Sequence, residues 1–126
     1  MSKTAIVSPK LAPPVGPFSQ AIRADGFIYF SGQVGQDPAT GKLVDGGVLA
    51  ETEQVFKNLA AVLEAAGKSF DDVVRAGVFL TSMGEFAAMN GVYAKHFGQP
   101  FPARTTIAVA GLPLGANVEI DLIVRA

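Results

Sequence analysis

The sequence predicts an α+β fold in which a single, mostly antiparallel sheet carries two helices on one face. Segments with strand-like alternation occur near both ends of the chain, and two segments with helical periodicity lie between them. Two amphipathic helices are enough to cover one face of one sheet. The chain has 126 residues and is 49% apolar, which fits one domain over residues 1–126.

Three strands are expected before the first helix. Residues 4–7 form a short apolar run ahead of a proline-rich loop and predict an edge strand. Residues 20–24 and 27–31 predict a hairpin, because the Asp25-Gly26 dipeptide between them favours a tight turn.

The two helices are predicted from apolar residues at 3.6-residue spacing. Residues 48–66 form the first, with Gly67 as its stop signal. Its buried stripe is expected to contain Thr52, Val55, Phe56, Leu59, Val62, Leu63 and Ala66. Ser82 and Glu85 resemble a capping box that starts the second helix. This helix is expected to bury Phe86, Met89, Tyr93 and Phe97.

A strand is predicted between the helices, and two more follow them. Residues 73–81 alternate so that one face is apolar, with Val74, Ala76, Val78 and Leu80. The last two strands are expected to form a hairpin around residues 112–116. If Ile107 and Val109 face the core, the opposite face of this hairpin carries Arg104, Thr106, Ala108, Glu119 and Asp121. Arg104 and Glu119 would then share a face, about 13–20 Å apart at the backbone.

Composition argues against several classes of function. The net charge is −1 with no cluster of Lys or Arg, which argues against a nucleic-acid partner. There is no Cys, and the lone His96, interpreted as a surface residue, cannot build a zinc site, so no metal or cofactor is expected. No apolar run is long enough for a bilayer and the start lacks a secretory signal, which predicts a cytoplasmic protein without a membrane partner.

Several motifs carry a family resemblance. Pro102-Ala-Arg-Thr-Thr106, then Leu112-Pro113 and Val118-Glu-Ile-Asp121, resemble the C-terminal signature of the Rid family (reactive intermediate deaminases, also called YjgF-like or L-PSP-like). Gly16-Pro-Phe-Ser-Gln20 and Phe30-Ser-Gly-Gln-Val34 agree with it upstream. The resemblance implies a chorismate-mutase-like fold and a homotrimer with a ligand cleft at each subunit boundary.

The resemblance also implies an activity, the hydrolysis of reactive 2-imino and enamine acids such as 2-aminoacrylate to 2-keto acids and ammonia. Arg104 would bind the substrate carboxylate and Glu119 would position or activate water. The residues expected to bind the substrate are Arg104, Thr106, Phe18, Ser31, Gly32 and Asn90. The family often has Tyr at the place of Phe18 and Cys at that of Thr106.

Other interpretations remain open from the sequence. The same scaffold could be a non-catalytic sensor that binds small carboxylic acids, with Glu119 as a structural partner. An endoribonuclease ranks third, because the chain offers no basic track and its lone His is expected on a helix. A less favoured alternative for Arg104 is a structural ion pair between subunits, with Asp121 or Glu119.

Overall fold

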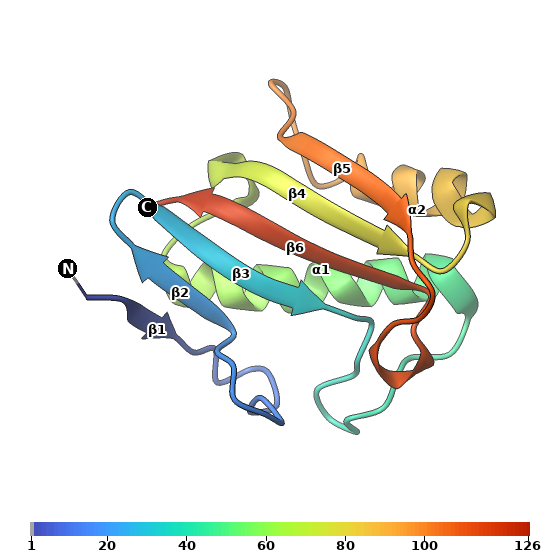
Figure 1. Cartoon of the computed structure of the whole chain (residues 1–126), viewed down its shortest axis with the longest axis horizontal. Helices are drawn as coiled ribbons and strands as arrows, with labels where there is room; N and C mark the ends of the chain where they lie inside the picture. Colours follow the sequence, from blue (N-terminus) through green and yellow to red (C-terminus); the bar gives the residue numbers. More distant parts are fainter. Residues whose placement is uncertain (1) are drawn as a thin grey trace.

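The computed structural model describes residues 2–126, so Met1, the first residue of the predicted domain, lies outside the described residues. In the described part, the strands form one sheet in the order β1-β2-β3-β6-β4-β5 (Figure 1). The strands are β1 (Thr4–Ile6), β2 (Ala21–Ala24), β3 (Phe27–Gln33), β4 (Val73–Leu80), β5 (Ala103–Ala108) and β6 (Val118–Arg125). The helices are α1 (Gly47–Ala66) and α2 (Phe86–Tyr93), with 3₁₀ turns η1 (Phe70–Asp72), η2 (Met83–Glu85) and η3 (Pro113–Gly115).

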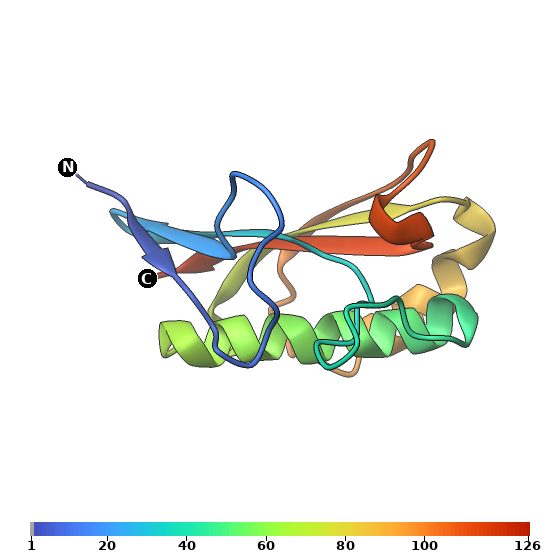
Figure 2. The same cartoon turned by 90° about the horizontal axis from the view of Figure 1, so that it is seen from below.

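Both helices cover the same face of the sheet, as predicted. Figure 2 shows α1 and α2 on one side of the sheet and η3 on the other, while the segment between β1 and β2 extends to both sides. Apart from the partly exposed Ala66, the predicted stripe of α1 is buried and packs on the alternate residues of β6 that point toward it. Gly67 ends α1 in a left-handed conformation (φ 71°), as expected for a helix stop signal.

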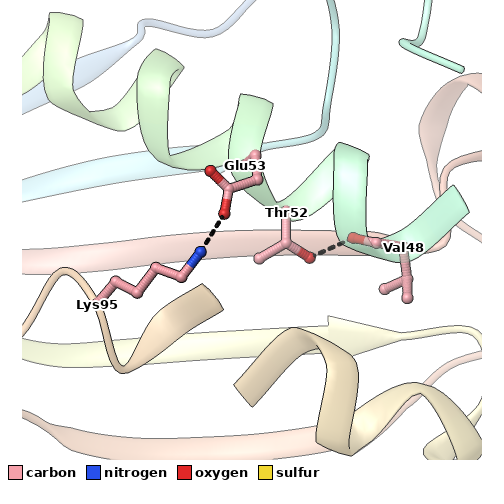
Figure 3. Close-up of polar contacts among 4 residues, drawn as sticks. All are labelled: Val48, Thr52, Glu53 and Lys95. Carbon is pink, nitrogen blue, oxygen red and sulfur yellow. Dashed lines mark hydrogen bonds and ion pairs between the residues drawn. The ribbon is translucent and has the colours of Figure 1, made fainter. Parts of the chain in front are cut away.

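Figure 3 shows a hydrogen bond within α1 and an ion pair between α1 and the segment that follows α2. The hydroxyl of the buried Thr52 donates to the carbonyl of Val48, 2.6 Å away, within α1. The Nζ of Lys95 lies 3.2 Å from Oε1 of Glu53, which links the segment after α2 to α1. The ion pair is solvent-exposed, so apolar packing between the helices supplies most of the stability here.

The prediction of a hairpin between the last two strands is wrong. β6 lies between β3 and β4 and is antiparallel to both, whereas β5 pairs in parallel with the outer side of β4. The reason is α2, which connects β4 to β5 and supplies the long crossover that a parallel pair requires. The chain then returns past the end of β4, where the N–H of Val109 donates to the carbonyl of Leu80.

Because of this pairing, β5 faces the opposite way from the prediction. Its register places Arg104 beside Ala76 and Thr106 beside Val78, which are buried on the helix face of the sheet. Ile107, predicted in the core, is instead 45% exposed on the face without helices. The sequence predicts the alternation of side chains in β5 correctly, but it assigns the two sets of side chains to the wrong faces of the sheet.

Three smaller expectations also need correction. A register shift between Val73 and Arg75 turns Val74 outward to 40% exposure and buries Val73 in its place. Ser82 accepts a hydrogen bond from the N–H of Gly84 and opens the turn η2, so α2 begins only at Phe86. His96, interpreted as a surface residue, is partly buried and stacks on the ring of Phe56 at 4.2 Å between centroids.

The face of the sheet opposite the helices, called the open face here, retains large apolar side chains. Phe27 and Tyr29 of β3 and Ile107 of β5 are each 43–48% exposed. This exposure is high for large apolar side chains on a sheet and indicates a surface that another molecule can cover. Among residues 2–126, no helix is long and apolar enough to cross a membrane.

Candidate active site

Arg104 lies on β5 at the edge of the sheet and is held by side chains of α2. Its Nη1 donates to Oδ1 of Asn90 at 2.7 Å, and its guanidinium stands 4.6 Å from the ring centroid of Tyr93. Phe86 adds a second ring at 5.6 Å. None of the acidic residues within 2–126 forms an ion pair with Arg104. The guanidinium is therefore oriented, with donors left for an external carboxylate.

Two hydroxyl groups on the same side of the sheet have no hydrogen-bond partner within the described chain. They are the Oη of Tyr93, in a side chain that is 6% exposed, and the Oγ1 of Thr106. Burial raises the pKa of Tyr93, while the nearby charge of Arg104 opposes the shift. Buried polar atoms are normally satisfied, so these hydroxyls can accept a partner from water, a ligand or a second chain.

Glu119 lies on the open face near the start of β6. Its side chain crosses Gly32 of β3 so closely that a Cβ built on that glycine would stand 2.8 Å from Cδ of Glu119. Only glycine at position 32 leaves this space. Burial raises the pKa of Glu119, and the like charge of Asp121 raises it further. Because its pKa is raised, the carboxyl group of Glu119 exchanges protons closer to neutral pH than that of an exposed Glu.

Ser31 precedes Gly32 in β3, and its hydrogen bonds reach the segment that carries Phe18. The hydroxyl of Ser31 donates to the carbonyl of Ser19 at 2.5 Å, and its N–H donates to the carbonyl of Gln20. These bonds fix the segment that carries Phe18 against the end of β3. Phe18 itself is 56% exposed, so its ring is free to contact a ligand.

The seven predicted site residues therefore fall into two groups. Arg104, Thr106 and Asn90 form the first, called the arginine group, and Glu119 with Gly32, Ser31 and Phe18 forms the second, called the glutamate group. The expectation that Arg104 and Glu119 share a face is wrong. Arg104 pairs with Ala76 and Glu119 with Phe79, which point to opposite faces of β4.

The distance between the two residues follows from the same register. They are three residues apart along β4 and lie on strands to either side of it, so their backbones are separated by about 10 Å along and about 10 Å across the sheet. The separation agrees with the expected 13–20 Å. Because the side chains point in opposite directions, one small ligand cannot touch both within one chain.

A buried contact that the sequence analysis missed supports the glutamate group. Glu51 of α1 is 1% exposed, and its two carboxylate oxygens accept from the backbone N–H and the side-chain amide of Asn117 at 2.7 and 2.6 Å. Asn117 also accepts from the N–H of Thr81 through its carbonyl. These hydrogen bonds fix the turn that contains Asn117, and Glu119 follows two residues later. A charged residue inside the apolar stripe of α1 was the available signal.

Comparison with known proteins identifies the family. The family described as Endoribonuclease L-PSP matches residues 9–126. A 2-iminobutanoate/2-iminopropanoate deaminase of Capra hircus is 48% identical over 94% of this chain and 87% of its own. A RutC family protein of Pyrococcus horikoshii is 44% identical over 96% of both chains. The crystal structure of a Rid family protein of Yersinia pestis superimposes with a TM-score of 0.95 at 40% identity, covering 99% of this chain and 100% of that one.

These matches cover nearly the whole chain at identities well above those that show a fold alone. The chain belongs to the Rid (L-PSP-like) family, as its motifs predicted. Among residues 2–126, no group of three or more His, Cys, Asp or Glu side chains is placed to hold a metal ion.

Proposed function

We propose that this chain is a deaminase that hydrolyses small 2-imino acids, and their enamine tautomers such as 2-aminoacrylate, to 2-keto acids and ammonia. The observation that carries the proposal is the state of Arg104, which Asn90 and Tyr93 orient but which no acid of its own described chain neutralises. Such a guanidinium matches the carboxylate common to these substrates. Relatives from Capra hircus and Dermatophagoides farinae, 48% and 44% identical, carry the name 2-iminobutanoate/2-iminopropanoate deaminase.

The proposed active site is completed by a second copy of the chain. Arg104 and Glu119 point to opposite faces of one sheet, so a ligand that uses both requires the arginine group of one copy and the glutamate group of its neighbour. The apolar residues of the open face give such copies a surface to bury. A closed homotrimer with a cleft at each subunit boundary satisfies both requirements, because a head-to-tail interface joins unlike surfaces.

The chemistry then follows from the roles of the two groups. Arg104 holds the carboxylate of the substrate, and the ring of Phe18 covers it. Glu119 takes a proton from water while the water oxygen bonds to C2 of the iminium form, and the C=N nitrogen becomes a neutral amine. The same carboxyl group gives this proton to the amine. As the C–N bond breaks and ammonia leaves, the hydroxyl group on C2 passes its proton to the Glu119 carboxylate and becomes the carbonyl of the 2-keto acid.

The direct test is the rate of pyruvate and ammonia release from 2-aminoacrylate with the wild-type protein, Arg104→Ala and Glu119→Gln. We expect Arg104→Ala to lower kcat/KM by about 10²–10³-fold, since it removes one partner of a charge pair. Glu119→Gln should lower kcat by about 10²–10⁴-fold, because it removes the proton carrier. Arg23→Ala is the matched control, since Arg23 lies on β2 and donates to the carbonyl of Ala66.

Binding of keto acids without acceleration of the reaction would contradict the proposal and favour a non-catalytic acid-binding protein. Dissociation or unfolding of Arg104→Ala would instead indicate that Arg104 is a structural partner between copies. Size-exclusion chromatography with light scattering on each variant separates these outcomes.

A further inference from the structure

β6 carries two carboxylates on the open face, and each lies over a glycine of a different neighbouring strand. Glu119 lies over Gly32 of β3, and Asp121 lies over Gly77 of β4. A Cβ built on Gly77 would overlap Oδ1 of Asp121 and stand 3.2 Å from its Cγ. Two positions without side chains thus create the space that two acidic groups occupy, although the proposed reaction uses only Glu119.

The second carboxylate is fixed in place by the backbone. The N–H of Gly77 donates to Oδ1 of Asp121 at 3.1 Å. Glu119 and Asp121 are two residues apart on one strand, so their Cβ atoms are separated by about 7 Å on the same face. Neither forms an ion pair with a residue in 2–126. Burial raises the pKa of Asp121, whereas the N–H of Gly77 and the charge of Arg75 favour its ionised form, so Asp121 is a fixed carboxyl group beside Glu119.

Other ionisable groups on the elements packed against β6 do not replace Asp121 as the neighbour of Glu119. β3 presents the phenol of Tyr29, which pairs with Ile123 further along β6. β4 presents Arg75, which donates to Oγ1 of Thr105 and whose positive charge acts on Asp121. Arg125, at the far end of β6, is engaged by Asp72, and Glu51 of α1 lies on the other face with Asn117.

We propose that Asp121 is a positioning residue for the deamination. Its negative charge increases the proton affinity of Glu119, so that Glu119 can both accept a proton from water and return it to the leaving amine. The inference rests on the proposed function. Two nearby carboxylates do not ionise independently: the charge of one disfavours the charge of the other, and they titrate as a coupled pair. A carboxyl group made more basic in this way is a better proton carrier at neutral pH.

The test uses Asp121→Asn, which keeps the size of the side chain and an oxygen for the N–H of Gly77 but removes the charge. In ¹³C NMR of the carboxyl carbons, the midpoint of the Glu119 titration should fall by about 0.5–1 pH unit, as expected for partly screened charges about 7 Å apart. The acid limb of kcat/KM for 2-aminoacrylate should move to lower pH by the same amount. Asp71→Asn, an exposed carboxylate of η1, should change neither curve.

An unchanged Glu119 titration in Asp121→Asn would overturn the inference. If that variant does not fold, the wild-type spectra decide, because a coupled pair predicts that the Glu119 resonance responds in two steps and an independent group predicts one. Wild-type protein that hydrolyses no imine would overturn the proposed function and the role of Asp121 in it. The NMR titration would then still show whether Asp121 controls the proton affinity of Glu119.

Discussion

The regions around Arg104 and Glu119 are built in opposite ways. Arg104 stands on the edge strand β5 and is held by side chains of one short helix, Asn90 and Tyr93. Glu119 stands on β6, between two strands, and the turn before it is clamped to the buried Glu51. Within residues 2–126, Arg104 forms no ion pair with an acidic residue and Glu119 forms none with a basic residue. In the proposed site, each chain supplies one group held by the side chains of a short helix and one group held by the sheet.

The largest effect is expected where the glutamate region meets the core. Glu51→Ala leaves the backbone N–H and the amide of Asn117 without their partners, so it should lower the free energy of unfolding by about 2–3 kcal/mol. Chemical denaturation measures this change. Glu53→Ala is the matched control on the same helix, and the loss of its exposed pair with Lys95 should change stability by less than about 1 kcal/mol. Equal effects of the two variants would contradict the difference between the regions.

A smaller effect, on binding rather than stability, is expected in the arginine region. Asn90→Ala removes the acceptor that orients Nη1 of Arg104, and KM for 2-aminoacrylate should rise about tenfold, equivalent to one hydrogen bond to a charged group. Unfolding free energy should change by about 0.5 kcal/mol or less, since the site is at the surface of α2. Steady-state kinetics together with denaturation tests both statements. A loss of stability comparable to that of Glu51→Ala would show that this region also belongs to the core.

The smallest effect concerns pH and the segment after α2. Burial against Phe56 lowers the pKa of His96, although the charge of Glu53 opposes the shift. Folding therefore favours neutral His96, and its contribution to stability is complete above the ordinary pKa of 6.5 and lost as pH falls toward the lower folded value. His96→Phe keeps the stacked ring and removes the proton. Its melting temperature should fall less than that of the wild type between about pH 7.5 and 5.5; parallel curves would contradict this account.

Much of the fold followed from patterns within single segments. The stripe of α1, the stop at Gly67 and the alternation of β6 depend on local periodicity, and each was predicted correctly. The pairing of β5 failed because strand order is a property of the whole chain. A helix between β4 and β5 was the available signal for a parallel pair, but the turn residues before β6 suggested a hairpin instead.

The candidate site was predictable to a similar degree. Arg104, Glu119 and their predicted companions came from motifs, which carry residue identity without geometry. The contact of Arg104 with the rings of Tyr93 and Phe86 was not predicted, because these two residues have the spacing of ordinary core residues. The placement of the Glu119 and Asp121 side chains over Gly32 and Gly77 was not predicted either. It depends on strand order and register, and the sequence does not show which strands are neighbours.

The central claim is that Arg104 of one copy and Glu119 of another act on one substrate. Co-producing Arg104→Ala and Glu119→Gln in one cell, with a different tag on each, isolates mixed oligomers that contain both. In a head-to-tail trimer, one of the three boundaries then joins an intact Arg104 to an intact Glu119, so activity should return to about one third of the wild-type value. Activity no higher than that of the single variants would contradict the claim.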